Sequence, residues 1–233
     1  GHLDLGHATG CGGQAAQILA WGKTSAEAFG MSENAAEAAA GTYGNLFVSM
    51  GMASQKSASM SMALVQLAGD LASFNNLEPG IVLEKLRAGL TGESEPLKEL
   101  GININDAILK AKALELGLIK GGSTAAMKLK QMAFTDALKA STEATKKYGA
   151  GSQKALKATV AMEKAQADLE KAASGVPGTL DAITKAQASY ALIFEQSATA
   201  QGDFGRTSKG LANQQRILKA NLENTAAIIG TAL

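Results

Sequence analysis

Few residues of this 233-residue chain have the type and spacing of a catalytic or metal-binding site. The histidines His2 and His7 and the single cysteine, Cys11, could in principle hold zinc. These three residues lie in a glycine-rich terminal run, where we expect a frayed segment and not a preformed cage. The serines and threonines have no internal histidine to act as their general base. We therefore predict no catalytic residue, no metal site and no cofactor.

Other patterns that could bind a ligand are incomplete. Gly22-Lys23-Thr24 resembles the end of a phosphate-binding loop, but Gln17 stands where that loop needs a glycine. The Gly10–Gly12 run has no apolar strand before it, as a dinucleotide-binding turn requires. Glu93 and Glu95 lie beside lysines in a polar context, so we interpret this carboxylate pair as solvated charge and not as a glycosidase pair.

Composition favours an interaction or structural role. The chain contains 45 alanines, only 4% aromatic residues and a formal net charge of +1. Residues 120–171 hold ten lysines against five acidic residues, whereas residues 1–119 hold seven basic against twelve acidic residues. We interpret the lysines as a solvated face; docking on an acidic surface or nucleic acid is the alternative, although residues 120–171 contain no arginine. No apolar run reaches the roughly 20 residues of a membrane-spanning helix.

Helical periodicity is the main structural signal. Between residues 36 and 74, apolar or small residues recur at alternating steps of three and four, which is a heptad pattern. Gly51 predicts a break into two helices. We predict that the strong second half is a self-association seam, the alternative being an ordinary core-facing side. This seam consists of Met60, Leu64, Leu67, Leu71 and Phe74.

No segment alternates with period two, so we predict an all-α fold of elongated helical rods and hairpins with coiled-coil-like packing. Asn105 is placed to cap a helix that ends at Gly117. The chain divides into four expected segments. These are an irregular lead-in at 1–24, a helical segment with the seam and short helices at 25–119, a lysine-rich helical hairpin at 120–174, and a C-terminal helix pair at 175–233.

Three stretches, residues 26–76, 86–118 and 189–230, resemble a known family. Their motifs are LAGDLASF, GLTGESEPLKELGI and AQGDFGRT followed by ANQQRIL. In this order they resemble the internal homology region of tail tape measure proteins of long-tailed bacteriophages and prophages. The resemblance covers roughly half of the chain, and the hairpin lies where such proteins would vary.

This resemblance implies a structural protein and not an enzyme. Such proteins occupy the tail-tube lumen, set tail length during assembly in the host cytoplasm, and leave ahead of the DNA at infection. The implied partners are further copies of the chain, the tail tube protein, tail tip or baseplate hub proteins, and tail assembly chaperones. Because tape measure proteins are generally much longer, we expect this chain to be a portion of a longer polypeptide. Anchoring to the tail tip, binding by chaperones and, less favoured, a tail-borne cell-wall hydrolase fragment are the alternative functions.

Two further groups of residues complete the expectations. We interpret AQGDFGRT as a helix joint, in which glycines allow the chain to turn, Phe204 fills the corner, and Asp203 or Thr207 caps the next helix. A partner contact is the alternative. The joint consists of Gly202, Asp203, Phe204, Gly205, Arg206 and Thr207. The last helix presents an apolar face made of Leu211, Leu218, Leu222 and Ile229.

Overall fold

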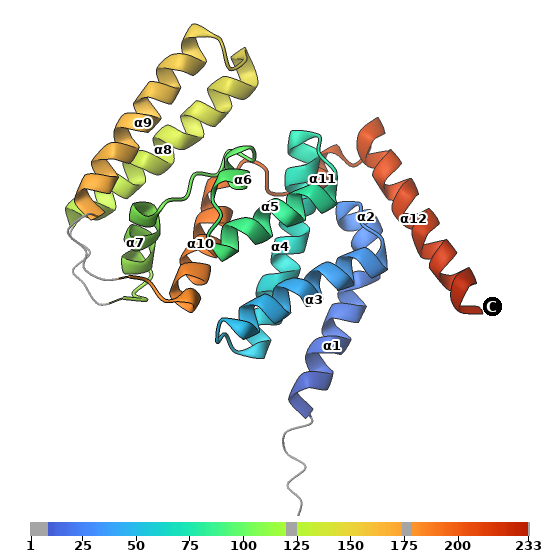
Figure 1. Ribbon diagram of the computed structural model, residues 1–233. Helices are drawn as coiled ribbons and strands as arrows, with labels where there is room; N and C mark the ends of the chain where they lie inside the picture. The colour runs from blue at the N-terminus through green and yellow to red at the C-terminus, as the bar shows by residue number, and fades with distance from the viewer. Residues whose placement is uncertain (1–8, 120–124, 174–178, 233) are drawn as a thin grey trace, which may run out of the picture. The chain divides into compact units, whose positions relative to one another are not determined.

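The computed structural model describes residues 9–119, 125–173 and 179–232, whose path is shown in Figure 1. All regular secondary structure of these residues is helical, so the all-α prediction is confirmed, whereas coiled-coil-like packing stays a prediction. In chain order the helices are α1 (Thr9–Gly22), α2 (Ser25–Phe29), α3 (Glu33–Ser49), α4 (Ser54–Asn75), α5 (Pro79–Thr91), α6 (Glu95–Lys98), α7 (Asp106–Glu115), α8 (Ala125–Tyr148), α9 (Gln153–Ala173), α10 (Ala182–Gln196), α11 (Asp203–Thr207) and α12 (Leu211–Ala232).

The helix boundaries follow local chain chemistry. Gly51 has a φ of +96° between α3 and α4, which confirms the predicted break. Asn76 ends α4 with a φ of +53°, a left-handed conformation that asparagine tolerates better than most residues. The Asn105 side chain accepts a 2.9 Å hydrogen bond from the Ile108 N–H and so caps α7 as predicted. Short-range signals therefore locate most helix ends.

The chain folds into two compact units. Unit 1 consists of the described residues of Gly1–Arg87 and Thr199–Leu233, and unit 2 consists of those of Ala88–Ala198. The expected segments 25–119 and 175–233 are each divided between these units. Within unit 2, α10 packs on α7, and within unit 1, α12 packs on α2 and α3, so the two helices of the expected C-terminal segment belong to different units.

Unit 1 is organised around α4, which contacts α1, α2, α3 and α11 (Figure 1). Apolar side chains of several helices bury against it, including the aromatic rings of Phe29, Tyr43, Phe47 and Phe204. Although the sequence contains few aromatic residues, unit 1 uses these four in its core. The Tyr43 hydroxyl also donates a 2.6 Å hydrogen bond to the Leu83 carbonyl, which fixes α3 on α5.

The predicted self-association seam lies in this core. Met60, Leu64, Leu67 and Leu71 are buried inside unit 1, and Phe74 at the end of α4 is partly buried. The self-association interpretation of this stripe is therefore wrong, and the ordinary core-facing interpretation holds. The physical reason is that α4 is surrounded by helices of its own chain, which remove the stripe from water.

The N-terminal lead-in also differs from expectation. The irregular structure expected over residues 1–24 is wrong for Thr9–Gly22, which form α1 and contact α3 and α4 through their described residues. Alanine-rich sequence around Ile18 favours a helix despite the glycines. His2 and His7 lie outside the described residues, and nothing in the structure bears on a zinc site there.

Unit 2 contains α6 to α10 and the end of α5. The predicted hairpin is present as α8 and α9, which pack against each other along their length. Its inner side buries Met127, Phe134, Leu138 and Leu169. The α7 and α10 helices pack on each other and on the hairpin, and they enclose Ile108 and Ile193. Unit 2 therefore has its own apolar core.

Candidate functional site

The predicted helix joint is built around an acidic residue of α4. The Asp70 carboxylate accepts hydrogen bonds of 2.8 Å from the Gly202 N–H and 3.1 Å from the Phe204 N–H. These amides lie at the N-terminus of α11, whose own N-cap residue, Gly202, has no side chain to cap them. The α4 helix therefore caps α11 through a contact between distant parts of the sequence.

The Asp70 carboxylate is buried, and its environment perturbs its charge. Burial raises the pKa of Asp70 above its ordinary value of 3.8. Its two amide hydrogen bonds and the Arg206 guanidinium lower the pKa in part, whereas the nearby Asp203 raises it. A carboxylate held in this way by backbone amides is a structural cap, because its lone pairs are directed at the amides.

A chain of polar side chains continues from this cap into α12. Ser73 donates a 2.7 Å hydrogen bond to the Asp203 carboxylate, and Asn213 donates to the hydroxyls of Ser73 (2.8 Å) and Thr207 (2.9 Å). Arg216 in turn donates a 2.6 Å hydrogen bond to the Asn213 side-chain oxygen. The joint is thus a polar network that connects α4, α11 and α12.

The remaining joint residues have distinct positions. Phe204 is fully buried, as expected of a corner residue, and a Cβ placed on Gly30 would lie 2.7 Å from its ring. Gly202 has a φ of +73°, which permits the turn, whereas Gly205 lies inside α11 with no left-handed conformation. Arg206 is exposed and donates a 2.7 Å hydrogen bond to the Gln201 carbonyl. Asp70, Ser73 and Asn213 also belong to the joint. They were not among the residues predicted for it, because the sequence does not reveal their hydrogen-bond partners.

The predicted apolar face of the last helix is exposed to solvent. Leu211, Leu218, Leu222 and Ile229 point away from unit 1, which α12 contacts with its opposite side. We name these four residues the outward stripe. An exposed apolar stripe on a protein surface marks a candidate interaction site.

A buried cation lies in unit 2, at a position that no sequence pattern marks. The Lys112 ammonium of α7 forms ion pairs with Glu115, at 2.7 Å, and with Glu195 of α10. Gln131 and Thr135 of α8 donate hydrogen bonds to the same two carboxylates. Burial lowers the pKa of Lys112, but the hydrogen bonds and charges of the two glutamates outweigh it and raise the pKa overall. This cluster connects three helices of unit 2 and stays charged at neutral pH.

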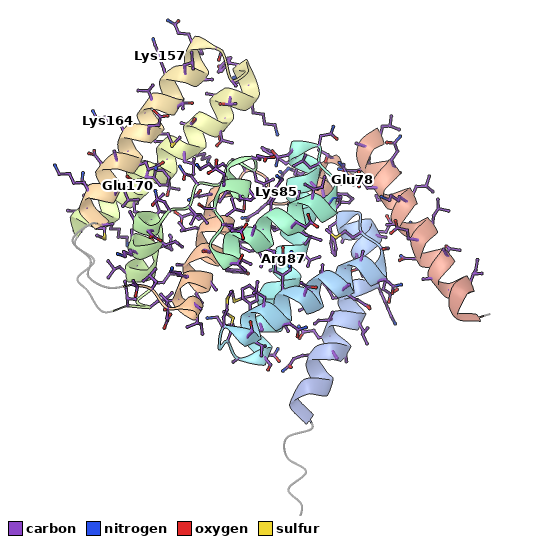
Figure 2. The ribbon with its side chains drawn as sticks, in the orientation of Figure 1. Glu78, Lys85, Arg87, Lys157, Lys164 and Glu170 are labelled. Atoms are coloured by element: carbon purple, nitrogen blue, oxygen red, sulfur yellow. The ribbon has the colours of Figure 1, made fainter. Side chains whose placement is uncertain are left out.

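The lysine-rich face lies on the outer side of the hairpin. Lys157 and Lys164 project from α9 away from α8 (Figure 2) and are exposed. Lys154 lies 4.5 Å from the centre of the Tyr148 ring, near the hairpin turn. This arrangement fits the interpretation as a solvated face, because the lysines are spread along both α8 and α9 and most of them are exposed.

One hollow in unit 1 could accommodate a small group. It has a volume of about 210 Å³ and is lined by α5, α12 and the turn after α2. Glu78 and Glu223 oppose Arg216 and Lys219 around it, so the charges of its wall balance. Among the described residues, no group of His, Cys, Asp and Glu is arranged to hold a metal ion.

Comparisons of the chain with protein-family models, with curated proteins and with solved structures gave no match. Among the described helices, none combines the length and the apolar character needed to cross a bilayer. The polar joint and the outward stripe are therefore the features on which a functional proposal can be based.

Proposed function

We propose that this chain is a structural component of a bacteriophage tail, a tape measure protein segment that lies in the tail-tube lumen. In this role it sets tail length during assembly and leaves ahead of the DNA at infection. The proposal rests on the resemblance of residues 26–76, 86–118 and 189–230 to the internal homology region of tape measure proteins.

One observation carries the proposal furthest. Asp70 belongs to LAGDLASF, and the amides that it binds belong to AQGDFGRT, so two of the resembling motifs form one joint. The resembling residues 86–118 include α7, which packs on α10, and the second half of α10 belongs to the third stretch. The resembling motifs are distant in sequence but contact one another. We expect this if the resemblance reflects a shared folded unit and not only a similar amino-acid composition.

A second candidate function is an anchoring module at the tail tip, or a segment held by tail assembly chaperones. The antiparallel packing of α8 and α9 favours it, since a helix advances about 1.5 Å per residue only while the chain keeps one direction. A folded hairpin therefore adds little length per residue.

The hairpin tip offers a test that leaves the packed base intact. Fourteen residues of helical heptads inserted into each arm, beside Gly149 and Ser152, would lengthen the folded hairpin by about 21 Å. If this segment measures length, tails carrying the extended parent protein become longer in electron micrographs. As a control, an equal number of residues is inserted into a tail protein that does not set tail length. Unchanged tail length would assign the segment to anchoring.

Membership of the tail is tested separately by mass spectrometry. Peptides from α4 and α12 should occur at fixed copy number in intact virions and be lost from tails that have ejected their DNA. Peptides that never copurify with virions would contradict both candidate functions.

A further inference from the structure

The last helix packs on unit 1 with the less apolar of its two sides. Among the described side chains of α12, Asn213, Ile217 and Ala220 are buried. Asn224 adds a polar contact on the same side, because its side-chain oxygen accepts a 2.8 Å hydrogen bond from the Glu33 N–H. The inner side of α12 is thus small or polar at most positions, with Ile217 as its large aliphatic residue, while Leu211, Leu218, Leu222 and Ile229 point outward.

The outward stripe has the spacing of a helix–helix seam. Leu211, Leu218, Leu222 and Ile229 are 76%, 61%, 62% and 57% exposed, and they follow one another at steps of seven, four and seven. Gln215 lies on the same line, four positions after Leu211 and three before Leu218. Thr225 likewise lies three positions after Leu222 and four before Ile229. This is the heptad pattern that a helix shows toward a partner helix.

The stripe is also symmetric in sequence about position 220. Leu211 and Ile229 each lie nine positions from this centre, Gln215 and Thr225 five, and Leu218 and Leu222 two. An antiparallel second copy would therefore place aliphatic residues against aliphatic residues and the polar pair against each other. We propose that α12 forms an antiparallel two-fold interface with α12 of a second copy of this chain, which requires such a self-complementary surface.

The size and charge of the stripe fit this occupant. At roughly 100 Å² per exposed aliphatic side chain, the stripe offers about 400 Å² per copy. Two copies with their flanking helix surfaces approach the ~1,000 Å² that a specific interface requires. Lys219 is the charged residue that directly flanks the stripe, and its ammonium lies 3.7 Å from the Glu78 carboxylate of its own chain. This ion pair moderates repulsion between the two lysines near the axis.

The interface is independent of the tail proposal, and purified full chain tests it. In sedimentation equilibrium we expect a reversible dimer, and the paired substitutions Leu218→Glu and Leu222→Glu should weaken it at least about 100-fold. The matched control is Leu156→Glu with Val160→Glu on α9, which are exposed to similar extents, 55% and 64%. Circular dichroism and Trp21 fluorescence verify that each variant is folded. The proposal would be overturned if the wild-type chain stayed monomeric up to about 100 micromolar, the highest concentration tested. It would also be overturned if the control variant lost the dimer to the same extent.

The orientation is tested with disulfides in a Cys11→Ser background. A mixture of Leu211→Cys and Ile229→Cys chains should form the mixed disulfide. Leu211→Cys alone should not crosslink, because the two copies of residue 211 would lie about 27 Å apart along an antiparallel pair. Efficient crosslinking between two copies of residue 211 would indicate a parallel pair and overturn the antiparallel interface.

A gain of affinity gives an independent test that unfolding cannot mimic. Thr225→Leu places an aliphatic residue in the polar layer opposite Gln215, and we expect the dimer to tighten by about tenfold. An unchanged dissociation constant would place this residue outside the interface and contradict the proposed register.

Discussion

The Asp70 carboxylate accepts a 2.8 Å hydrogen bond from the backbone N–H of Gly202, although 132 positions separate the two residues in the sequence. Because α11 has five residues and no side-chain cap of its own, its free amides depend on this carboxylate. The contact also holds the returning chain against α4. One side chain therefore fixes the start of α11 and the path of the chain into α12.

We predict that Asp70→Ala lowers the free energy of unfolding of unit 1 by about 2–3 kcal/mol, because the part-buried Gly202 amide and the buried Phe204 amide lose their acceptor. Urea denaturation followed by Trp21 fluorescence measures this. Trp21 is the only tryptophan of the sequence, and it stacks on Phe29 in unit 1 with ring centres 5.2 Å apart. The control is Glu84→Ala at an exposed position of α5 in unit 1, which should change stability by less than about 0.5 kcal/mol. Equal effects of the two substitutions would contradict the capping role.

Local features of the fold could be predicted from sequence, and long-range contacts could not. Gly51, Asn76 and Asn105 break or cap helices through interactions within a few residues, so their types and spacing identify them. The partners of Asp70 are backbone amides, which every residue except proline has, so nothing in the sequence marks them. A heptad pattern likewise does not reveal whether its residues are buried within their own unit, as the buried Leu64 of the seam and the exposed Leu218 of the outward stripe illustrate.

A pair of glycines provides a test of close helix packing. A Cβ on Gly69 of α4 would lie 2.5 Å from the Phe29 Cβ and 2.7 Å from the Phe29 carbonyl oxygen. We expect Gly69→Ala to destabilise unit 1 by about 2–3 kcal/mol, since backbone cannot move aside cheaply. At Gly41 of α3, which has an ordinary helical φ, an added Cβ would meet no atom within 4 Å, so Gly41→Ala should stabilise by about 0.5–1 kcal/mol. The same urea titrations report both, and effects of the same sign would contradict this packing.

The buried lysine of unit 2 predicts an asymmetry between two ion pairs of equal length. Lys112→Met should destabilise unit 2 by about 2 kcal/mol, because Glu115 and Glu195 lose a buried partner but keep part of their exposure to water. Lys98→Met removes the exposed pair with Glu95, also 2.7 Å long, and should cost less than about 0.5 kcal/mol. Hydrogen exchange of the α7 and α10 amides, measured by mass spectrometry, distinguishes them. Unchanged exchange in Lys112→Met would show that the cluster contributes nothing to stability.

The carboxyl group of Glu37 in α3 should make the stability of unit 1 depend on pH, because its Oε1 is buried and has no hydrogen-bond partner among the described residues. Burial, followed by the nearby Glu33, raises the pKa of Glu37 above its ordinary value of 4.5, while Lys23 lowers it in part. A raised pKa in the folded state means that the folded protein binds this proton more tightly than the unfolded chain does. The stabilisation is therefore complete below the ordinary pKa and is lost as the pH rises through the folded value.

Glu37→Gln removes this charge, so we expect the variant to exceed the wild type in stability by up to about 1 kcal/mol at pH 7. The advantage should disappear near pH 4, where the wild-type carboxyl group is itself neutral. Urea titrations at a series of pH values, again followed by Trp21 fluorescence, measure the difference. Glu84→Gln, at an exposed position of α5, should show no such pH-dependent difference from the wild type. A variant that is less stable than the wild type at pH 7 would indicate that the charged form of Glu37 is the stabilising one.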